Sequence, residues 1–166
     1  RPVEGQVSAF LDWIHKLSGP RMVGVNISYN HEFDDGKYGA RVGGALRSAV
    51  TGPNDIDMYS VQGQFDWYWG RPANYPIKFG SGAGLAANYF SSDAPSFWHW
   101  SVPVYPAEFT WYAVNRRSWG MDVMVDLGIH AFPPFDAGDF GSLNPGVSTE
   151  EWEFPFAALV GLEFSF

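Results

Sequence analysis

The chain ends on the stretch Glu153-Phe-Pro-Phe-Ala-Ala-Leu-Val-Gly-Leu-Glu-Phe-Ser-Phe166, in which alternate positions from Phe154 onward are apolar. The positions between them are mostly small or polar. This period of two is typical of a β-strand, because successive side chains point to opposite faces of a pleated backbone. Trp152 extends the pattern to about fifteen residues, where about five or six are usual. The stretch therefore predicts a long strand over residues 150–166 with one apolar face.

The composition indicates a chain with much apolar surface to cover. Aromatic residues make up 18% of the 166 residues and charged residues 17%, against roughly 25% charged residues in ordinary soluble domains. The length suits one domain spanning 1–166. The net charge of −8, with scattered Lys and Arg residues, excludes nucleic acid as a partner. Because the chain has no Cys, disulfides and thiolate metal sites are excluded as well.

The alternating pattern recurs upstream and predicts an all-β chain. Turn residues separate eight candidate strands. Their approximate bounds are 6–15, 22–33, 38–50, 56–70, 76–90, 99–115, 119–131 and 150–166. The first is ambiguous, since its apolar residues also fit the spacing of an amphipathic helix over 5–17. No run of eighteen apolar residues is present, which excludes a transmembrane helix.

The lengths of the connections favour eight strands. Transmembrane β-barrels have an even number of strands, with short turns at one end and longer loops at the other. If 6–15 is a strand, all the short connections fall at one end and both long ones at the other. The short connections are 34–37, 71–75 and 115–118, and the long ones are 91–97 and 132–149. We therefore expect an eight-stranded antiparallel barrel, with a helix as the alternative for the first element.

Each candidate strand has one apolar and one polar face. The apolar faces carry Val23, Val25, Ile27, Val61, Phe65, Trp67, Tyr105, Phe109, Trp111, Val123 and Val125. The polar faces carry Asn26, Ser28, Arg41, Arg47, Gln62, Gln64, Asp66, Lys78, Glu108, Asp122 and Asp126. Two interpretations fit this alternation: a soluble barrel of the lipocalin kind with the apolar face inside, or a membrane barrel with that face outside.

Three features favour the membrane barrel. The apolar faces carry too many large rings for the interior of an eight-stranded barrel, which side chains only just fill. The polar faces are rich in Gly, Ala, Ser and Gln, whereas a soluble surface has many Lys and Glu residues. Trp and Tyr residues cluster near strand ends, as in the aromatic belts at membrane interfaces. We therefore expect a transmembrane β-barrel with its apolar faces toward lipid.

Two stretches resemble a known class of proteins. Val160-Gly-Leu-Glu-Phe-Ser-Phe166 resembles the closing strand of bacterial outer-membrane β-barrel proteins. Tyr75-Pro-Ile-Lys-Phe-Gly-Ser-Gly-Ala-Gly-Leu-Ala-Ala87 is similar to the Gly-rich fifth strand of small eight-stranded members, including outer-membrane protein A-type domains and lipid A deacylases. The resemblance implies residence in the bacterial outer membrane, contact with its lipid and lipopolysaccharide, and recognition of the last strand by the barrel-assembly machinery. It leaves the surface ligand of the loops unspecified.

The polar faces, turned inward, predict a charged lumen. Its basic residues are Arg41, Arg47 and Lys78, and its acidic residues are Asp12, Asp66, Glu108, Asp122, Asp126, Glu153 and Glu163. Because buried charges must be paired, we expect a network of ion pairs that plugs the lumen. Each basic residue is expected to contact one of Asp66, Glu108, Asp122, Asp126 or Glu163. The surplus of acid implies either carboxylates that share protons or a bound cation.

A row of glycines, Gly80, Gly82 and Gly84, removes side-chain volume from one wall of this lumen. It either makes room for facing side chains or leaves a narrow water-filled cavity. An acid-lined path would favour cations, so a narrow cation-preferring channel is one alternative function.

His99 and Ser101 form a candidate catalytic pair, two residues apart on one face of a strand and near a long loop. They resemble the membrane-facing His-x-Ser pair of the lipid A deacylases. The resemblance implies that the His activates the Ser for ester hydrolysis while a carboxylate orients the His. Asp93, Glu150 and Glu151 are the candidates for that carboxylate. A lipid A-modifying esterase is therefore a second alternative function.

The seventh strand departs from the deacylase pattern. The family carries its pair on this strand, which here reads Gly128-Ile-His-Ala-Phe132, with Phe132 where Ser is required and His130 facing the lumen. The four His residues lack metal-ligand spacing, and no phosphate loop or cofactor fingerprint is present. The sequence therefore predicts a barrel with a structural or surface-interaction role and without a cofactor or metal.

Overall fold

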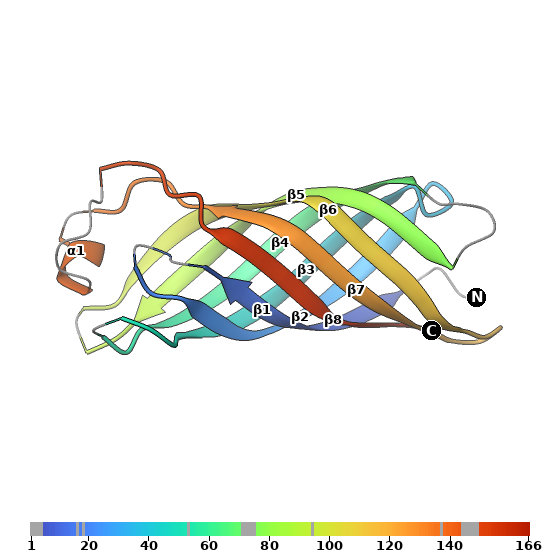
Figure 1. The fold of residues 1–166 in the computed structure, drawn as a ribbon, viewed down its shortest axis with the longest axis horizontal. Helices are drawn as coiled ribbons and strands as arrows, with labels where there is room; N and C mark the ends of the chain where they lie inside the picture. Colours follow the sequence, from blue (N-terminus) through green and yellow to red (C-terminus); the bar gives the residue numbers. More distant parts are fainter. Residues whose placement is uncertain are drawn as a thin grey trace.

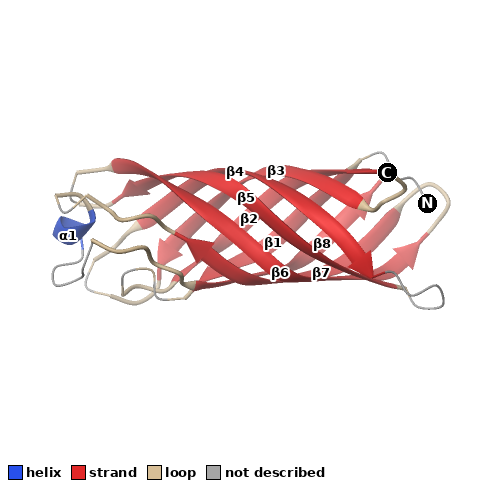
Figure 2. Cartoon of the chain, turned by 90° about the horizontal axis from the view of Figure 1, so that it is seen from above, coloured by secondary structure: helices blue, strands red, loops and turns tan. Residues whose placement is uncertain are grey.

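The chain forms a closed antiparallel barrel of eight strands in the computed structural model (Figures 1 and 2). The structure describes residues 5–15, 17, 19–52, 54–70, 76–93, 95–136, 138–143 and 150–166. The strands are β1 (Gln6–Ile14), β2 (Met22–Phe33), β3 (Tyr38–Ala49), β4 (Asp57–Gly70), β5 (Ile77–Ser91), β6 (Phe97–Asn115), β7 (Gly120–Ala131) and β8 (Phe156–Ser165). A four-residue helix, α1 (Phe140–Leu143), lies in the connection between β7 and β8. Each strand pairs with its neighbour in sequence, and β1 closes the barrel against β8.

The first element is a strand, which decides between the two alternatives for 5–17. All nine residues of β1 pair with both β2 and β8; Leu11, for example, lies between Val25 and Val160. A helix here would leave the facing edges of β2 and β8 without backbone partners. Closure of the barrel therefore outweighs the helical spacing, and the prediction of eight strands is confirmed.

The last strand is shorter than predicted. Regular pairing of β8 begins at Phe156, whereas the alternation indicates a start at 150. An isolated bridge joins Phe132 to Glu153, and the carbonyl of Pro155 accepts a hydrogen bond from the backbone of His130. Pro155 has no N–H to donate, so the regular ladder begins only after it.

The two ends of the barrel differ, as the connection lengths indicate. The start of β1 and the end of β8 lie at one end, here called the termini end, and α1 lies at the opposite end, the loop end (Figure 1). The termini end carries the tight β2–β3 turn, in which Asp34, Asp35 and Gly36 all have positive φ angles. The predicted turn at 71–75 lies outside the described residues. The loop end carries the connections after β1, β3, β5 and β7.

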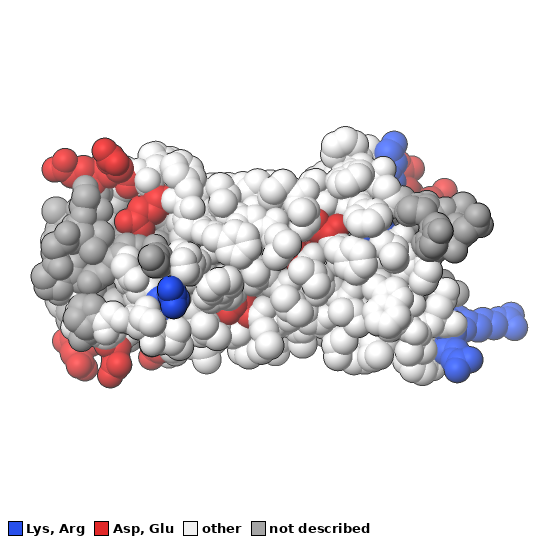
Figure 3. All heavy atoms as spheres, in the orientation of Figure 1, with Lys and Arg blue, Asp and Glu red and all other residues white. Residues whose placement is uncertain are grey.

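The exterior of the barrel is apolar. The most exposed side chains at mid-strand include Leu11, Ile27, Val42, Val61, Phe65 and Leu85. Exposed Trp98, Trp100 and Trp152 lie toward the loop end, and exposed Trp67, Trp69, Trp111 and Trp119 lie toward the termini end. Figure 3 shows charged side chains gathered at the two ends, with acidic ones prominent at the loop end. The apolar faces therefore point outward, as predicted, between two belts of Trp. Among the described residues, no helix is long and apolar enough to cross a membrane.

The prediction that Tyr105 faces outward is wrong. Its side chain is 1% exposed and lies in the lumen, as does that of Glu108 three residues later. The pairing of β6 with β7 shifts between Val104 and Ala107, next to Pro106, which has no N–H for the ladder. Such a bulge changes which parity faces inward, so an uninterrupted period of two does not hold along β6.

The interior is apolar at the loop end and mostly polar below it, where Phe10, Tyr105, Met124 and Leu159 are buried among the polar side chains. The apolar part, here called the loop-end cluster, consists of Ile14, Leu17, Met22, Ile56, Met58, Phe90, Phe132, Phe135 and Leu143. All of these side chains are buried, and they come from four strands and the connections between strands. The polar part contains the candidate site.

Candidate functional site in the lumen

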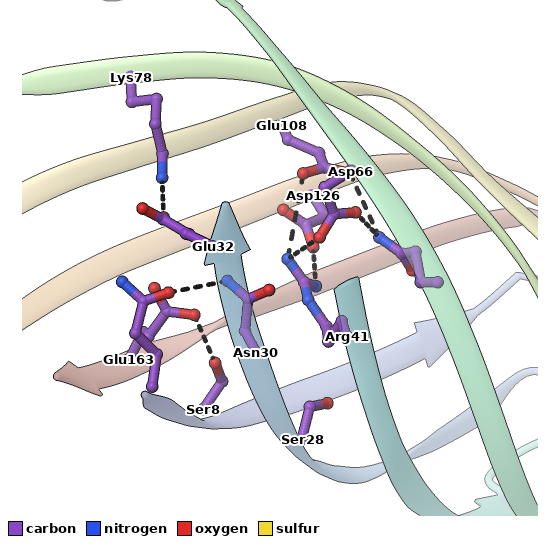
Figure 4. Close-up of polar contacts among 12 residues, drawn as sticks. Ser8, Ser28, Asn30, Glu32, Arg41, Asp66, Lys78, Glu108, Asp126 and Glu163 are labelled. Carbon is purple, nitrogen blue, oxygen red and sulfur yellow. Dashed lines mark hydrogen bonds and ion pairs between the residues drawn. The ribbon is translucent and has the colours of Figure 1, made fainter. Parts of the chain in front are cut away.

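Three carboxylate side chains, one each from β4, β6 and β7, meet around Arg41 of β3 (Figure 4). The guanidinium Nη1 of Arg41 lies 2.7 Å from Oδ2 of Asp126, and Nη2 lies 3.4 Å from Oδ2 of Asp66 and 4.0 Å from Oε2 of Glu108. All four side chains are buried. We call this group the Arg41 cluster. It holds three carboxylates around a single cation, which keeps them together but leaves an excess of acid.

Gln64 and Gly82 complete the surroundings of the Arg41 cluster. The amide Nε2 of Gln64 donates to Oδ1 of Asp66 at 2.6 Å and to Oε1 of Glu108 at 3.3 Å. A Cβ at Gly82 would lie only 2.1 Å from Oε1 of Glu108 and 2.4 Å from Oδ1 of Asp66. Gly82 therefore makes room for the side chains that face it.

A second polar group lies toward the termini end. Lys78 forms an ion pair with Glu32, and its Nζ lies 3.6 Å from the centre of the Tyr68 ring. Nearby, Ser8 donates to Oε2 of Glu163 at 2.8 Å (Figure 4). Glu32 is absent from the predicted lumen acids, although it has the same parity as the inward-facing Asn26, Ser28 and Asn30. The alternation of β2 alone could therefore have identified it.

A continuous chain of hydrogen bonds lies between the Arg41 cluster and the loop-end cluster. We call it the polar belt. Arg47 donates to both carboxylate oxygens of Asp12 at 2.7 Å and to Ser60 at 2.8 Å. Ser60 donates to Asn88 at 2.7 Å, Asn88 to Ser101 at 2.7 Å, and Ser101 lies 2.6 Å from Nε2 of His130. The belt thus links β1 to β3, β4, β5, β6 and β7.

The prediction that each basic residue contacts one of five named acids is confirmed for Arg41 and wrong for Arg47 and Lys78. The acid that Arg47 contacts is Asp12, and the acid that Lys78 contacts is Glu32. Arg47 reaches Asp12 because Gly24 lies between them in the register of β2 and has no side chain.

The other expected lumen acids differ in their surroundings. Asp122 and Glu163 are buried in the lumen, as expected. Glu153 was expected there too, but it is only half-buried at the loop end, where its backbone pairs with Phe132.

The expectation of a membrane-facing His99 and Ser101 pair is wrong. Ser101 is 0% exposed and faces the lumen, where its hydroxyl forms a hydrogen bond with the imidazole of His130 on β7. His99 Nε2 donates to the carbonyl of Pro133 at 2.9 Å, and its ring stacks on Phe135 at 4.2 Å between centroids. His99 and Ser101 therefore form hydrogen bonds with different residues. Ser101 and His130 lie on the adjacent strands β6 and β7. The strand order predicted from the sequence already makes these two strands neighbours.

The carboxylates expected to orient His99 lie elsewhere. Asp93, Glu150 and Glu151 are all exposed at the loop end. In the described part of the chain, no group of three or more His, Cys, Asp or Glu side chains is arranged to hold a metal ion.

A closed eight-stranded barrel with an apolar exterior and a polar lumen has the architecture of the small bacterial outer-membrane β-barrel proteins. Neisserial surface protein A has a similar structure, with a TM-score of 0.62 and 14% identity over 96% of this chain and 93% of that one. The outer membrane protein OprG from Pseudomonas aeruginosa gives a TM-score of 0.54 and 10% identity over 100% and 97%. At these identities the likeness establishes the fold. No protein-family model and no curated protein sequence matches the chain.

Proposed function

We propose that the chain is a structural or surface-interaction protein of the bacterial outer membrane whose lumen is plugged by its own side chains. The apolar exterior and the two Trp belts support the membrane placement, because amphipathic rings are most stable where headgroups meet acyl chains. On this placement, outer-membrane lipid and lipopolysaccharide contact the exterior. The barrel-assembly machinery would recognise β8.

The observation that carries the plugged lumen is the loop-end cluster. Nine buried apolar side chains, among them Phe132 and Phe135 from the start of the β7–β8 connection, fill the lumen just inside the loop end. An eight-stranded barrel is only just wide enough to be filled by side chains, so such a layer closes it to ions. The polar belt and the Arg41 cluster follow in succession below it.

The loop end supports a role in surface interaction. The β7–β8 connection is the longest in the chain and brings exposed acidic residues to this end, including Asp136, Glu150 and Glu151. Loops on a rigid scaffold commonly carry binding function.

Planar-bilayer recording tests the plugged lumen against a channel. We expect no unitary conductance from the wild-type barrel, while a porin added to the same bilayer as a control conducts. Conductance that prefers K⁺ over Cl⁻ and changes on Glu108→Gln would replace the proposal with a cation-preferring channel.

A further inference from the structure

Several buried polar atoms below the polar belt have no hydrogen-bond partner among the residues that the structure describes. Both amide atoms of Gln62 are among them, together with Oε1 of Gln64, Nε of Arg41, Oε2 of Glu108 and Oδ1 of Asp126. Gln62 itself is 3% exposed. Buried polar groups are nearly always hydrogen-bonded, to protein or to water, because an unpaired one costs about 1–3 kcal/mol. These atoms therefore indicate water in this part of the lumen.

The strands beside Gln62 carry short residues at the positions that face it. Gly43 and Ala86 flank Gln62 in the register of β3 and β5, and Gly84 flanks Gln64. None of these three neighbours carries a side chain beyond Cβ. Water that enters this space finds amide and carboxylate partners on several strands, which is what a buried hydration site requires.

The same part of the lumen is strongly acidic. Six buried carboxylates lie below the polar belt, and the two basic side chains with them are Arg41 and Lys78. The carboxylates are Glu32, Asp66, Glu108, Asp122, Asp126 and Glu163. An acid-lined, water-filled space attracts cations and repels anions.

The two boundaries of this space differ in polarity. Toward the loop end, the apolar side chains of the loop-end cluster oppose the entry of ions by excluding water. Toward the termini end, the barrier includes the buried Lys78–Glu32 ion pair, whose groups are charged and not apolar.

We propose that the lumen around Gln62, Gln64 and the Arg41 cluster is a hydrated chamber, which small monovalent cations enter from the termini end and which the loop-end cluster closes on the other side. The proposal rests on the plugged lumen proposed above and adds an internal compartment to it. The bound species are water and exchanging cations, without a fixed metal-ligand cluster.

Cysteine reactivity tests the chamber, because the natural chain contains no Cys and gives no background. Gln62→Cys places a thiol in the chamber. Met58→Cys, four residues away on the same inward face of β4, places a matched thiol in the loop-end cluster. Each folded variant is treated in liposomes with the cationic reagent 2-aminoethyl methanethiosulfonate and with the anionic 2-sulfonatoethyl methanethiosulfonate, and modification is followed by mass spectrometry.

We expect Gln62→Cys to react with the cationic reagent about tenfold faster than with the anionic one, and Met58→Cys to react slowly with both. Adding Glu108→Gln to Gln62→Cys should lower the charge preference. Gln64→Cys is the second chamber position if Gln62→Cys does not fold, as judged by its mobility in unheated SDS gels. Equal slow reaction of the Gln62 and Met58 variants would overturn the chamber, and equal fast reaction of the Gln62 variant with both reagents would overturn its preference for cations.

The outcomes separate this inference from the proposed function. A silent wild-type barrel with an unreactive Gln62→Cys removes the chamber and leaves the plugged barrel. A conducting wild-type barrel with a cation-selective Gln62→Cys removes the plug, and with it the closed side of the chamber, but leaves a hydrated lumen that attracts cations.

Discussion

Arg41 is the single residue on which the lumen depends most. Its guanidinium is the cation shared by Asp66, Glu108 and Asp126. Removing one partner of a buried ion pair is strongly destabilising, since the remaining charge is left without compensation. We predict that Arg41→Gln lowers the free energy of unfolding by about 3–5 kcal/mol, measured by urea unfolding in lipid vesicles.

The exposed pair of Lys37 and Asp34, at 3.9 Å, provides the control for Arg41. Lys37→Gln should change stability by less than about 1 kcal/mol, because exposed ion pairs are screened by water. Equal effects of the two substitutions would show that Arg41 does not hold the lumen together.

Ser101 is a link in the polar belt in this structure. Its hydroxyl lies between Asn88 and His130, so Ser101→Ala leaves two buried polar groups short of a partner. We predict a loss of about 1–3 kcal/mol in the same unfolding experiment. Ser48→Ala, which removes an exposed hydrogen bond to Asp57, is the control and should cost less. If both variants unfold alike, the belt does not stabilise the barrel.

At the scale of the strands, close approach of backbones explains particular glycines. A Cβ at Gly128 of β7 would lie 1.9 Å from the carbonyl oxygen of Val104 on β6, whereas a Cβ at Gly63 of β4 would meet nothing within 4 Å. Backbone atoms cannot move aside as flexible side chains can. We predict that Gly128→Ala costs about 1–3 kcal/mol or more by strain, while Gly63→Ala changes stability little. Comparison of the two unfolding midpoints checks this. A Gly128→Ala variant with an unchanged midpoint would contradict the register of β6 with β7.

The strands also show which features of the fold a single sequence predicts. Alternation and turn residues predict all eight strands, most bounds to within two residues, and the inward face of Arg41, Asp66 and Lys78, because these depend only on local pattern. The orientation of Tyr105 was mispredicted, since a bulge adds a residue that periodicity does not reveal.

The partners of the lumen residues were harder to predict than their orientation. The contact of Arg47 with Asp12 depends on the register of three strands and on the missing side chain of Gly24, which lie beyond local pattern. The membrane-facing assignment of Ser101 is wrong for the same reason as that of Tyr105, because both share the parity of Phe109 and the bulge between Val104 and Ala107 changes which parity faces inward. The contact of Ser101 with His130 requires the pairing of β6 with β7.

At the scale of the whole molecule, the distribution of polar and apolar side chains indicates where the barrel resides. Apolar side chains cover the outside between two Trp belts, charges gather at the ends, and the inside below an apolar layer is mostly polar. This arrangement is the reverse of a soluble barrel and fits a surrounding of lipid. It implies that outward positions at mid-strand are in contact with acyl chains.

Spin-label accessibility in lipid vesicles tests this central claim most directly. Nitroxides attached at single cysteines replacing Val61, Phe65 and Val160 should collide frequently with oxygen, which concentrates in the acyl region, and rarely with a water-soluble nickel chelate. Labels in place of Asp93 and Asp136 at the loop end should show the opposite. If the labels at Val61, Phe65 and Val160 were as accessible to the nickel chelate as those in the loops, the barrel would not span the bilayer and the account would be wrong.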